Sequence, residues 1–321
     1  MNFLDTILSP FRYVVSWILW AFHELFTLIG MNPDSGWTWT LSIVFLVLLI
    51  RTALIPVFVK QIKAQRAMQA LQPDLRKLQA KYKGKKDQLS QQAMIAEQRA
   101  LFKKHKTNPL SSCLPMLVQM PFFFALFRVL NSTSQAIGKE EGIGKLSLEH
   151  IKSFDQSSIF GARLSETFLG TINSDGPVNG AVIIVAIIMI LAMTASQFIT
   201  QKQIMSKNMT KEALEGPFMQ QQKIMLYILP LVFGIGGINF PIGVLIYWTA
   251  TNLWTLGQQY YVIRNNPTPG SAAERELNER RAAKGLPPVG QKKADEEAAA
   301  AVVEEPKVQR VQPQRKNRKK K

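Results

Sequence analysis

The sequence contains a single cysteine, Cys113, and only three histidines along its 321 residues. One cysteine excludes an internal disulfide bond and a cysteine-based zinc site. The histidines, His23, His105 and His150, lie far apart and show no ligand spacing, so we predict no metal site and no cofactor. The chain also lacks a nucleophile paired with a base and a glycine-rich phosphate loop, which argues against an enzyme.

Charge is absent from some long stretches and dense in others, although the net charge is +17. Soluble folds mix charge along amphipathic elements, so this separation indicates a membrane protein. About 20 mostly apolar residues span a bilayer. Residues 224–263 carry no charge and are long enough for two spans, with a break at Gly236–Pro241. We predict an all-α, polytopic fold with five transmembrane helices, at about 37–59, 110–131, 177–200, 224–240 and 241–263.

Residues 1–36 form a separate unit in this prediction. Apolar positions from Phe11 to Phe26 follow helical spacing, and the residues that interrupt them are Arg12, Ser16, His23 and Glu24. This pattern is typical of an amphipathic helix that lies in the membrane interface. A sixth span remains the alternative, and the sequence predicts no removable signal peptide.

Loop charge predicts the orientation of the spans. Residues 60–106 hold thirteen Lys and Arg against three acids, whereas the loop 132–176 holds four against six. The segment 201–223 and the chain after Arg264 are also basic. The positive-inside rule then places the loop 132–176 outside and the C-terminus in the cytoplasm of a multi-pass plasma membrane protein.

The two longest segments that we predict to be cytoplasmic differ in their predicted order. Residues 60–106 carry two apolar stripes at helical spacing, separated by Gly84, and predict a helical hairpin. Pro73 is tolerated only in a first helical turn, so it separates the first span from this hairpin. Residues 265–321 are rich in Ala, Glu, Lys and Pro and lack aromatics, which predicts a disordered basic tail.

Arg51 is the strongest candidate for a functional residue, because it is a charged side chain inside a predicted span. Charges inside a span are costly and usually face a bundle interior or a water-filled cavity. No span contains an acidic partner, which favours a hydrated groove over an arginine that snorkels to the headgroups. Other spans supply polar or aromatic side chains, which either line the same groove or serve as packing and interhelical hydrogen bonds. The full candidate set is Arg51, Gln119, Gln197, Tyr247, Trp248 and Asn252.

The chain ends in a basic run that is suited to RNA or anionic lipid. Ribosomal RNA would bind such a run with salt-dependent affinity, and the alternative is a topology signal and lipid tether. DNA is not an expected partner. The residues of this run are Arg315, Lys316, Arg318, Lys319, Lys320 and Lys321.

Several motifs, in order along residues 37–264, resemble the YidC/Oxa/Albino membrane protein insertases in the form without a large external domain. Each motif is weak alone, and the ordered set is specific. The motifs are Leu49–Thr52 with Ile55–Pro56, Met68–Pro73, Asn108–Leu110, Cys113–Pro115, Gln119–Pro121, Met219–Met225 with Pro230, Phe240–Gly243, Tyr247–Trp248 and Asn252.

The resemblance implies a bacterial insertase and chaperone that inserts and helps fold nascent membrane proteins through a positively charged groove open to cytoplasm and lipid. It implies that Arg51 is the groove arginine, that Gln197 and Trp248 line the groove, and that the hairpin contacts clients and targeting factors. A ribosome, a Sec-type translocon and anionic lipids are further expected partners. The long loop 132–176 and the Ala/Glu-rich tail depart from the family pattern.

A small-solute transporter or channel is the alternative function. Transporters often contain internal repeats and ionisable residues at the membrane midplane. This chain has no repeat and one such residue, Arg51. A scaffold that gathers other membrane proteins through the hairpin is a second alternative.

Overall fold

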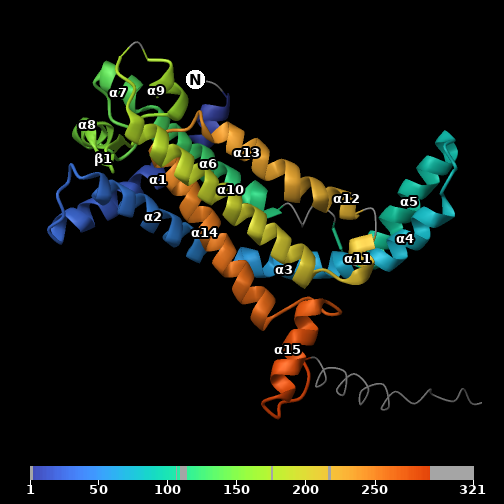
Figure 1. Ribbon diagram of the computed structural model, residues 1–321. Helices are drawn as coiled ribbons and strands as arrows, with labels where there is room; N and C mark the ends of the chain where they lie inside the picture. The colour runs from blue at the N-terminus through green and yellow to red at the C-terminus, as the bar shows by residue number, and fades with distance from the viewer. Residues whose placement is uncertain (1–2, 106, 109–113, 175, 216–217, 290–321) are drawn as a thin grey trace, which may run out of the picture.

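The computed structural model describes residues 3–105, 107–108, 114–174, 176–215 and 218–289, and nearly all of its regular structure is helical. The predicted all-α class is therefore confirmed, apart from one two-stranded ribbon. Long helices run side by side in a bundle, a helical pair projects from one end, and short elements cap the other end (Figure 1). The bundle contains α1 (Phe3–Leu28), α2 (Gly36–Ala53), α6 (Leu114–Asn131), α10 (Gly180–Asn208), α13 (Leu229–Gly237) and α14 (Ile242–Asn265).

The bundle core lies where α10 packs along α14, and where α1 packs against both α2 and α6. Side chains from these helices interdigitate there and are almost fully buried. Within a bilayer, such packing holds helices together because lipid tails are as apolar as the side chains. Members of this core are Leu19, Trp39, Leu126, Val182 and Leu245.

The outward faces of the bundle are apolar instead of charged. On α10, Ile184, Ile188 and Leu191 recur at helical spacing and are all well exposed. On α13, Leu231 and Ile235 repeat the pattern. Large exposed apolar faces are typical of surfaces that contact lipid or protein.

Two helices in the described part of the chain, α2 and α10, are long and apolar enough to cross a membrane. Shorter apolar stretches occupy Val118–Asn131 and Gln222–Gly237. The predicted number of five spans therefore stays a prediction. The predicted continuous helix 37–59 is interrupted at Leu54, where α2 ends and α3 (Ile55–Ala70) begins, because Pro56 has no backbone N–H and suits a first helical turn.

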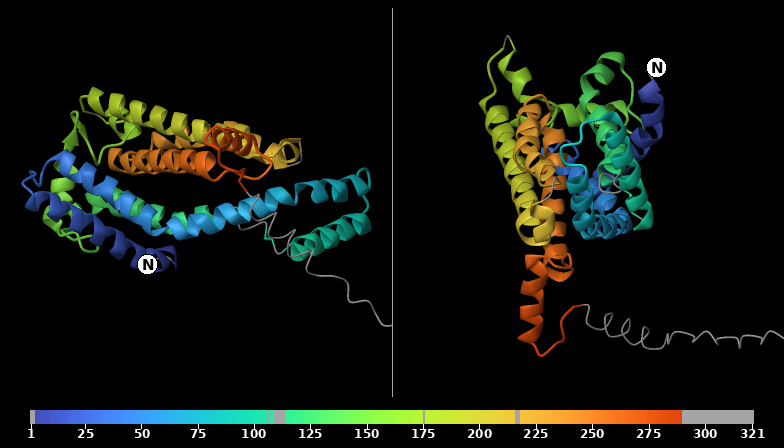
Figure 2. Two further views of the ribbon diagram at one scale, coloured as in Figure 1. Left: turned by 90° about the horizontal axis from the view of Figure 1, so that it is seen from below. Right: turned by 90° about the vertical axis from the view of Figure 1, so that its right-hand side faces the viewer.

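A helical pair extends from the end of α3 (Figure 2). It consists of α4 (Gln72–Lys81) and α5 (Gln88–Lys104), joined by a turn that contains Gly84 in the left-handed region at φ 85°. Pro73 lies in the first turn of α4. Residues 60–70 belong to α3, so the pair starts later than the predicted hairpin boundary at residue 60.

The loop 132–176 folds into a cap at the opposite end of the bundle (Figure 1). The strands pair antiparallel around a turn at Phe160 and Gly161, both with positive φ. Gly36 at the start of α2 lies against this cap, since an added Cβ would fall 2.1 Å from the carbonyl oxygen of Ser158. The cap contains α7 (Thr133–Lys139), α8 (Leu148–Gln156), β1 (Ser158–Ile159), β2 (Ala162–Arg163) and α9 (Phe168–Ile172).

The predicted disorder from residue 265 is wrong for its first part, because Ala272–Ala282 form helix α15. Ser271 caps this helix by accepting a hydrogen bond from the Glu274 backbone N–H at 3.3 Å, and Ser271–Glu274 has capping-box spacing. Asn208 of α10 also accepts from the backbone N–H of Thr268 at 2.8 Å, which anchors the segment. The remaining tail, residues 290–321, lies outside the described residues.

Candidate functional site

A pocket of about 360 Å³ lies between α6, α10, α13 and α14. Four of the six predicted groove residues line it: Gln119, Gln197, Tyr247 and Trp248. They come from three helices that are distant in sequence, so the bundle itself assembles this surface. The other lining residues are Met120, Phe123, Phe124, Leu229, Phe233 and Thr251.

Local irregularities shape the helices around the pocket. Residues Ile224–Ile228 form a π-helical segment that leads into α13, with Pro230 in the first turn of that helix. Short π-helical insertions often occur at functional sites. α12 (Phe218–Lys223) precedes this segment. Pro121 lies inside α6, directly after Gln119 and Met120, and removes one helical backbone hydrogen bond there.

A hydrogen bond crosses the pocket wall from α6 to α14. The side-chain amide of Gln119 donates through Nε2 to the hydroxyl oxygen of Tyr247 at 2.7 Å. The other amide atom, Gln119 Oε1, is buried without a partner among the described residues, and so is Gln197 Oε1. The pocket therefore presents unpaired acceptors inside an otherwise apolar wall.

Trp248 lies at the centre of an aromatic cluster. Its ring packs against Phe233 at 4.9 Å, Phe123 at 5.2 Å and Phe240 at 5.5 Å between ring centroids. Such aromatic pairs each contribute about 0.5–1.5 kcal/mol beyond area burial. The Trp248 side chain thus packs in the bundle and lines the pocket at once, so packing and client contact are compatible alternatives.

Arg51 is 6% exposed and lies outside the set of pocket-lining residues. Its guanidinium carbon lies 5.3 Å from the centroid of the Phe58 ring. In the described part of the chain, Arg51 Nε has no hydrogen-bond partner and the side chain forms no ion pair.

Asn252 does not line the pocket, although its Nδ2 is also buried without a partner among the described residues. It lies one helical turn after Trp248 on α14. The six basic residues predicted at the C-terminus, from Arg315 to Lys321, fall outside the described residues.

The sequence prediction missed the aromatic half of the site. Phe123, Phe124 and Phe233 line the pocket, but their side chains look like ordinary apolar residues of a span. The run Phe122–Phe124 is a weak signal that could have singled them out. Their role depends on helix rotation, which a uniformly apolar span does not encode.

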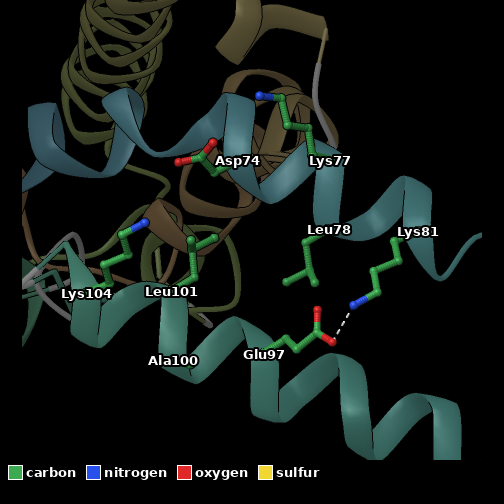
Figure 3. Close-up of a pocket in the computed structure, with 8 residues that line it drawn as sticks. All are labelled: Asp74, Lys77, Leu78, Lys81, Glu97, Ala100, Leu101 and Lys104. Carbon is green, nitrogen blue, oxygen red and sulfur yellow. Dashed lines mark hydrogen bonds and ion pairs between the residues drawn. The ribbon is translucent and has the colours of Figure 1, made fainter. Parts of the chain in front are cut away.

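A second cavity, of about 510 Å³, lies between α4 and α5 (Figure 3). Glu97 of α5 accepts from Lys81 at 2.5 Å and from the Tyr82 hydroxyl at 2.8 Å. The hydrogen bond from Lys81 is the main cause that holds the pKa of Glu97 below its ordinary value. His105 lies 3.5 Å from Asp74 at the other end of the same pair. Charged side chains therefore surround a small apolar strip of Leu78 and Leu101.

Known proteins are similar in sequence to this chain over most of its length. A family model described as 60Kd inner membrane protein matches residues 30–269. The membrane protein insertase YidC of Streptomyces avermitilis is 49% identical over 283 residues, which cover 86% of this chain and 64% of that protein. The YidC of Tropheryma whipplei, strain Twist, is 40% identical over 85% of this chain and 88% of its own. The YidC of Bifidobacterium longum is 34% identical over 99% and 96%.

A crystal structure described as an active YidC insertase with its first transmembrane domain resolved also aligns with this chain. The alignment covers 81% of this chain and 47% of that one, with 20% identity and a TM-score of 0.45.

Proposed function

We propose that this chain, which belongs to the 60Kd inner membrane protein family, inserts newly made polypeptide segments into the bacterial inner membrane. Family membership confirms the resemblance inferred from the ordered motifs. The relatives described above are named membrane protein insertases, and the chain spans 64% of the Streptomyces protein and 88% of the Tropheryma protein. The observation that carries the proposal is a pocket that combines unpaired polar atoms with an aromatic wall, in a bundle that also buries Arg51.

The buried polar atoms support a hydrated groove. An unpaired buried polar group costs about 1–3 kcal/mol, and an unpaired charge costs more. Arg51 Nε, Gln119 Oε1, Gln197 Oε1 and Asn252 Nδ2 are all in this state among the described residues. Water or a polar client segment would satisfy these atoms. A hydrated groove of this kind would let a polar client segment enter the inner half of the bilayer.

The charge of Arg51 then acts on acidic groups of a client. Two opposite unit charges about 10 Å apart attract by about 1.7 kcal/mol at an effective dielectric constant of about 20, on the order of tenfold in an equilibrium. The apolar part of the client passes along the Trp248 cluster into lipid. Its burial there is favourable by roughly 25 cal/mol per Å² of apolar surface, so this step needs no nucleotide.

The proposal includes the topology predicted from loop charge. Five spans place the α4–α5 pair and the C-terminus in the cytoplasm and the cap of residues 132–176 outside. The basic C-terminal run meets ribosomal RNA or anionic lipid, and the α4–α5 pair meets clients and targeting factors. A Sec-type translocon is a further proposed partner, and chaperone activity follows from shielding an apolar client during folding.

Reconstitution in liposomes tests this function and the arginine together. A single-span client with an acidic N-terminal tail is synthesised beside the vesicles, and protease protection of its tail is measured. We expect Arg51→Ala to reduce protection on the order of tenfold and Arg51→Lys to retain most of it, since charge is the acting property. Arg163→Ala, which removes an exposed arginine of the cap, serves as the matched control and should leave protection unchanged.

Two other outcomes would contradict parts of this proposal. Protection that depends on the protein but is equal in Arg51→Ala keeps the insertase and removes the role assigned to the arginine. Protection no greater than in empty liposomes, with an active control insertase, rejects the function itself.

A further inference from the structure

The fold brings together two histidines and a carboxylate where α1 meets the cap. His23 and Glu24 belong to α1, and His150 belongs to α8. One ligand atom from each of the three side chains lies within 4.8 Å of the others. The sequence predicted no metal site because these histidines are far apart along the chain, and only the packing of α8 on α1 makes them neighbours.

His23 is buried and its ring is held on two sides. It is 3% exposed, and its ring stacks on Trp39 with 4.0 Å between centroids. His23 Nε2 lies 2.9 Å from the carbonyl oxygen of Pro33, which accepts only, so Nε2 carries the proton of the neutral ring. Nδ1 then carries the lone pair, and it is buried without a partner among the described residues. An unsatisfied buried acceptor of this kind indicates a missing cationic or donor partner.

The other two side chains are positioned but accessible. His150 Nε2 lies 2.8 Å from Glu24 Oε1, and its Nδ1 lies 2.5 Å from the hydroxyl of Ser147. The side chain of His150 is 20% exposed and that of Glu24 is 47% exposed, so an ion can reach them from solvent. Ser147 also caps α8 by accepting from the backbone N–H of His150.

We propose that His23, Glu24 and His150 bind a zinc ion, with water as the fourth ligand. Two imidazoles and one carboxylate are a known ligand set for tetrahedral zinc, and nitrogen donors disfavour calcium and magnesium. Zinc ligands at about 2.0–2.1 Å from the metal lie about 3.3 Å apart in a tetrahedron. Rotations of the two accessible side chains, His150 and Glu24, close the 4.8 Å spacing.

The surroundings of His23 match those of metal-ligating histidines. Such residues usually donate their other ring N–H to a carbonyl or carboxylate, which fixes the tautomer. The Pro33 carbonyl takes this role for His23, and it also accepts from the hydroxyl of Ser153 at 3.0 Å. Ser153 in turn accepts from Trp39 Nε1 at 3.1 Å. The ligand, its stacking partner and the carbonyl thus form one connected network.

Bound zinc would join the N-terminal helix to the cap. α1 and α8 are otherwise linked at this point by the exposed His150–Glu24 pair, which is a weak contact by itself. A metal that binds the folded protein only will raise its thermal midpoint as its concentration rises. The role is structural and does not depend on the proposed insertase function.

Zinc binding is measured directly on the full-length protein, purified without a polyhistidine tag and placed in nanodiscs. Calorimetry with Zn²⁺, and visible absorption with Co²⁺, should both report one metal per chain. Glu24→Gln and His150→Ala should each weaken binding by at least about tenfold. His105→Ala removes the histidine near Asp74 on the α4–α5 pair, Cys113→Ser removes the thiol, and both should leave binding unchanged.

Glu24→Gln is the decisive variant, because its amide oxygen can still accept from His150. We therefore expect Glu24→Gln to fold, and it tests the site even if His150→Ala unfolds. Absence of Zn²⁺ binding by the unaltered protein would overturn the proposal. So would equal affinity in Glu24→Gln and the unaltered protein. A thermal midpoint that rises with Zn²⁺ in the unaltered protein, but not in Glu24→Gln, would support it.

Discussion

At the scale of single residues, the candidate site is defined by what its polar atoms lack. Arg51, Gln119, Gln197 and Asn252 each bury a polar atom without a partner in the described part of the chain. Stable cores avoid this state because each such atom costs about 1–3 kcal/mol. Two of them, Gln119 and Gln197, line the pocket, where water or a bound polar segment would satisfy them.

We predict that Gln119→Leu lowers client insertion several-fold, because it removes an unpaired acceptor and leaves the Tyr247 hydroxyl without its donor. Gln201→Leu is the matched control, since Gln201 donates to Gln222 at 2.6 Å but does not line the pocket. Both variants lose one amide hydrogen bond, worth about 0.5–1.5 kcal/mol, so their thermal midpoints should fall by similar amounts. Equal insertion by the two variants would show that Gln119 serves only to join helices.

At the scale of elements, interruptions in the helices position the functional surfaces. The break at Leu54 redirects the chain from α2 into α3, and the π-helical segment Ile224–Ile228 precedes the pocket residue Leu229. A proline follows each interruption: Pro56 follows the break at Leu54, and Pro230 follows the π-helical segment. Each proline lacks the backbone N–H that would continue the α-helical hydrogen bonds. The α4–α5 pair differs, since it is held by a thin apolar strip and by charge.

The α4–α5 contact should respond to pH through Glu97. Hydrogen bonds from Lys81 and then Tyr82 lower the pKa of Glu97 below its ordinary value of 4.5. A carboxylate with a lowered folded pKa stabilises the contact above its ordinary pKa and loses this contribution as pH falls through the lowered value. We expect spin labels on α4 and α5 to keep their distance from neutral pH down to about 4.5 and to separate below it.

Glu97→Gln should increase this separation already at neutral pH and remove most of the acid response. Lys104→Gln changes a charge that lines the same cavity without pairing with Glu97, and it should behave like the unaltered protein. If Glu97→Gln showed the same acid response as the unaltered protein, the separation of α4 and α5 at low pH would be due to other carboxylates.

At the scale of the whole molecule, acidic and basic segments lie at opposite ends of the bundle. Figure 1 places α7, α8 and α9 at one end and α4, α5 and α15 at the other. α11 (Lys211–Glu215) lies against α4, so the basic segment 201–223 shares that end. The apolar faces of α10 and α13 lie between the two ends, and the orientation in the membrane stays a prediction.

Cysteine labelling tests the predicted topology. In a Cys113→Ser background, single cysteines replace Lys85 in the α4–α5 turn, Phe160 in the cap and Lys284 after α15. All three sites are exposed. An impermeant maleimide added to intact cells should label position 160 only, and disruption of the membrane should expose positions 85 and 284. Labelling of position 85 in intact cells would reverse the orientation.

The sequence by itself determined the class of fold, the family and the polar candidates. Helical periodicity and the lack of charge are local properties, so the helices around Arg51, Gln197 and Trp248 followed from composition. The turn at Gly236–Pro241 followed for the same reason, and the structure ends α13 and begins α14 there. Local pattern also misled: the composition after residue 265 suggested disorder, although the capping spacing Ser271–Glu274 precedes a helix.

Tertiary structure alone decided which residues meet. The rotation of each helix places Phe123 and Phe233 beside Trp248, and no period in a uniformly apolar span specifies that rotation. Packing of the cap on α1 brings His150 to His23 across a long stretch of sequence. Such proximity depends on contacts between segments that are distant in sequence, and the energy of these contacts is shared among many side chains. Local sequence therefore determines the helices and strands, and only their packing determines the sites.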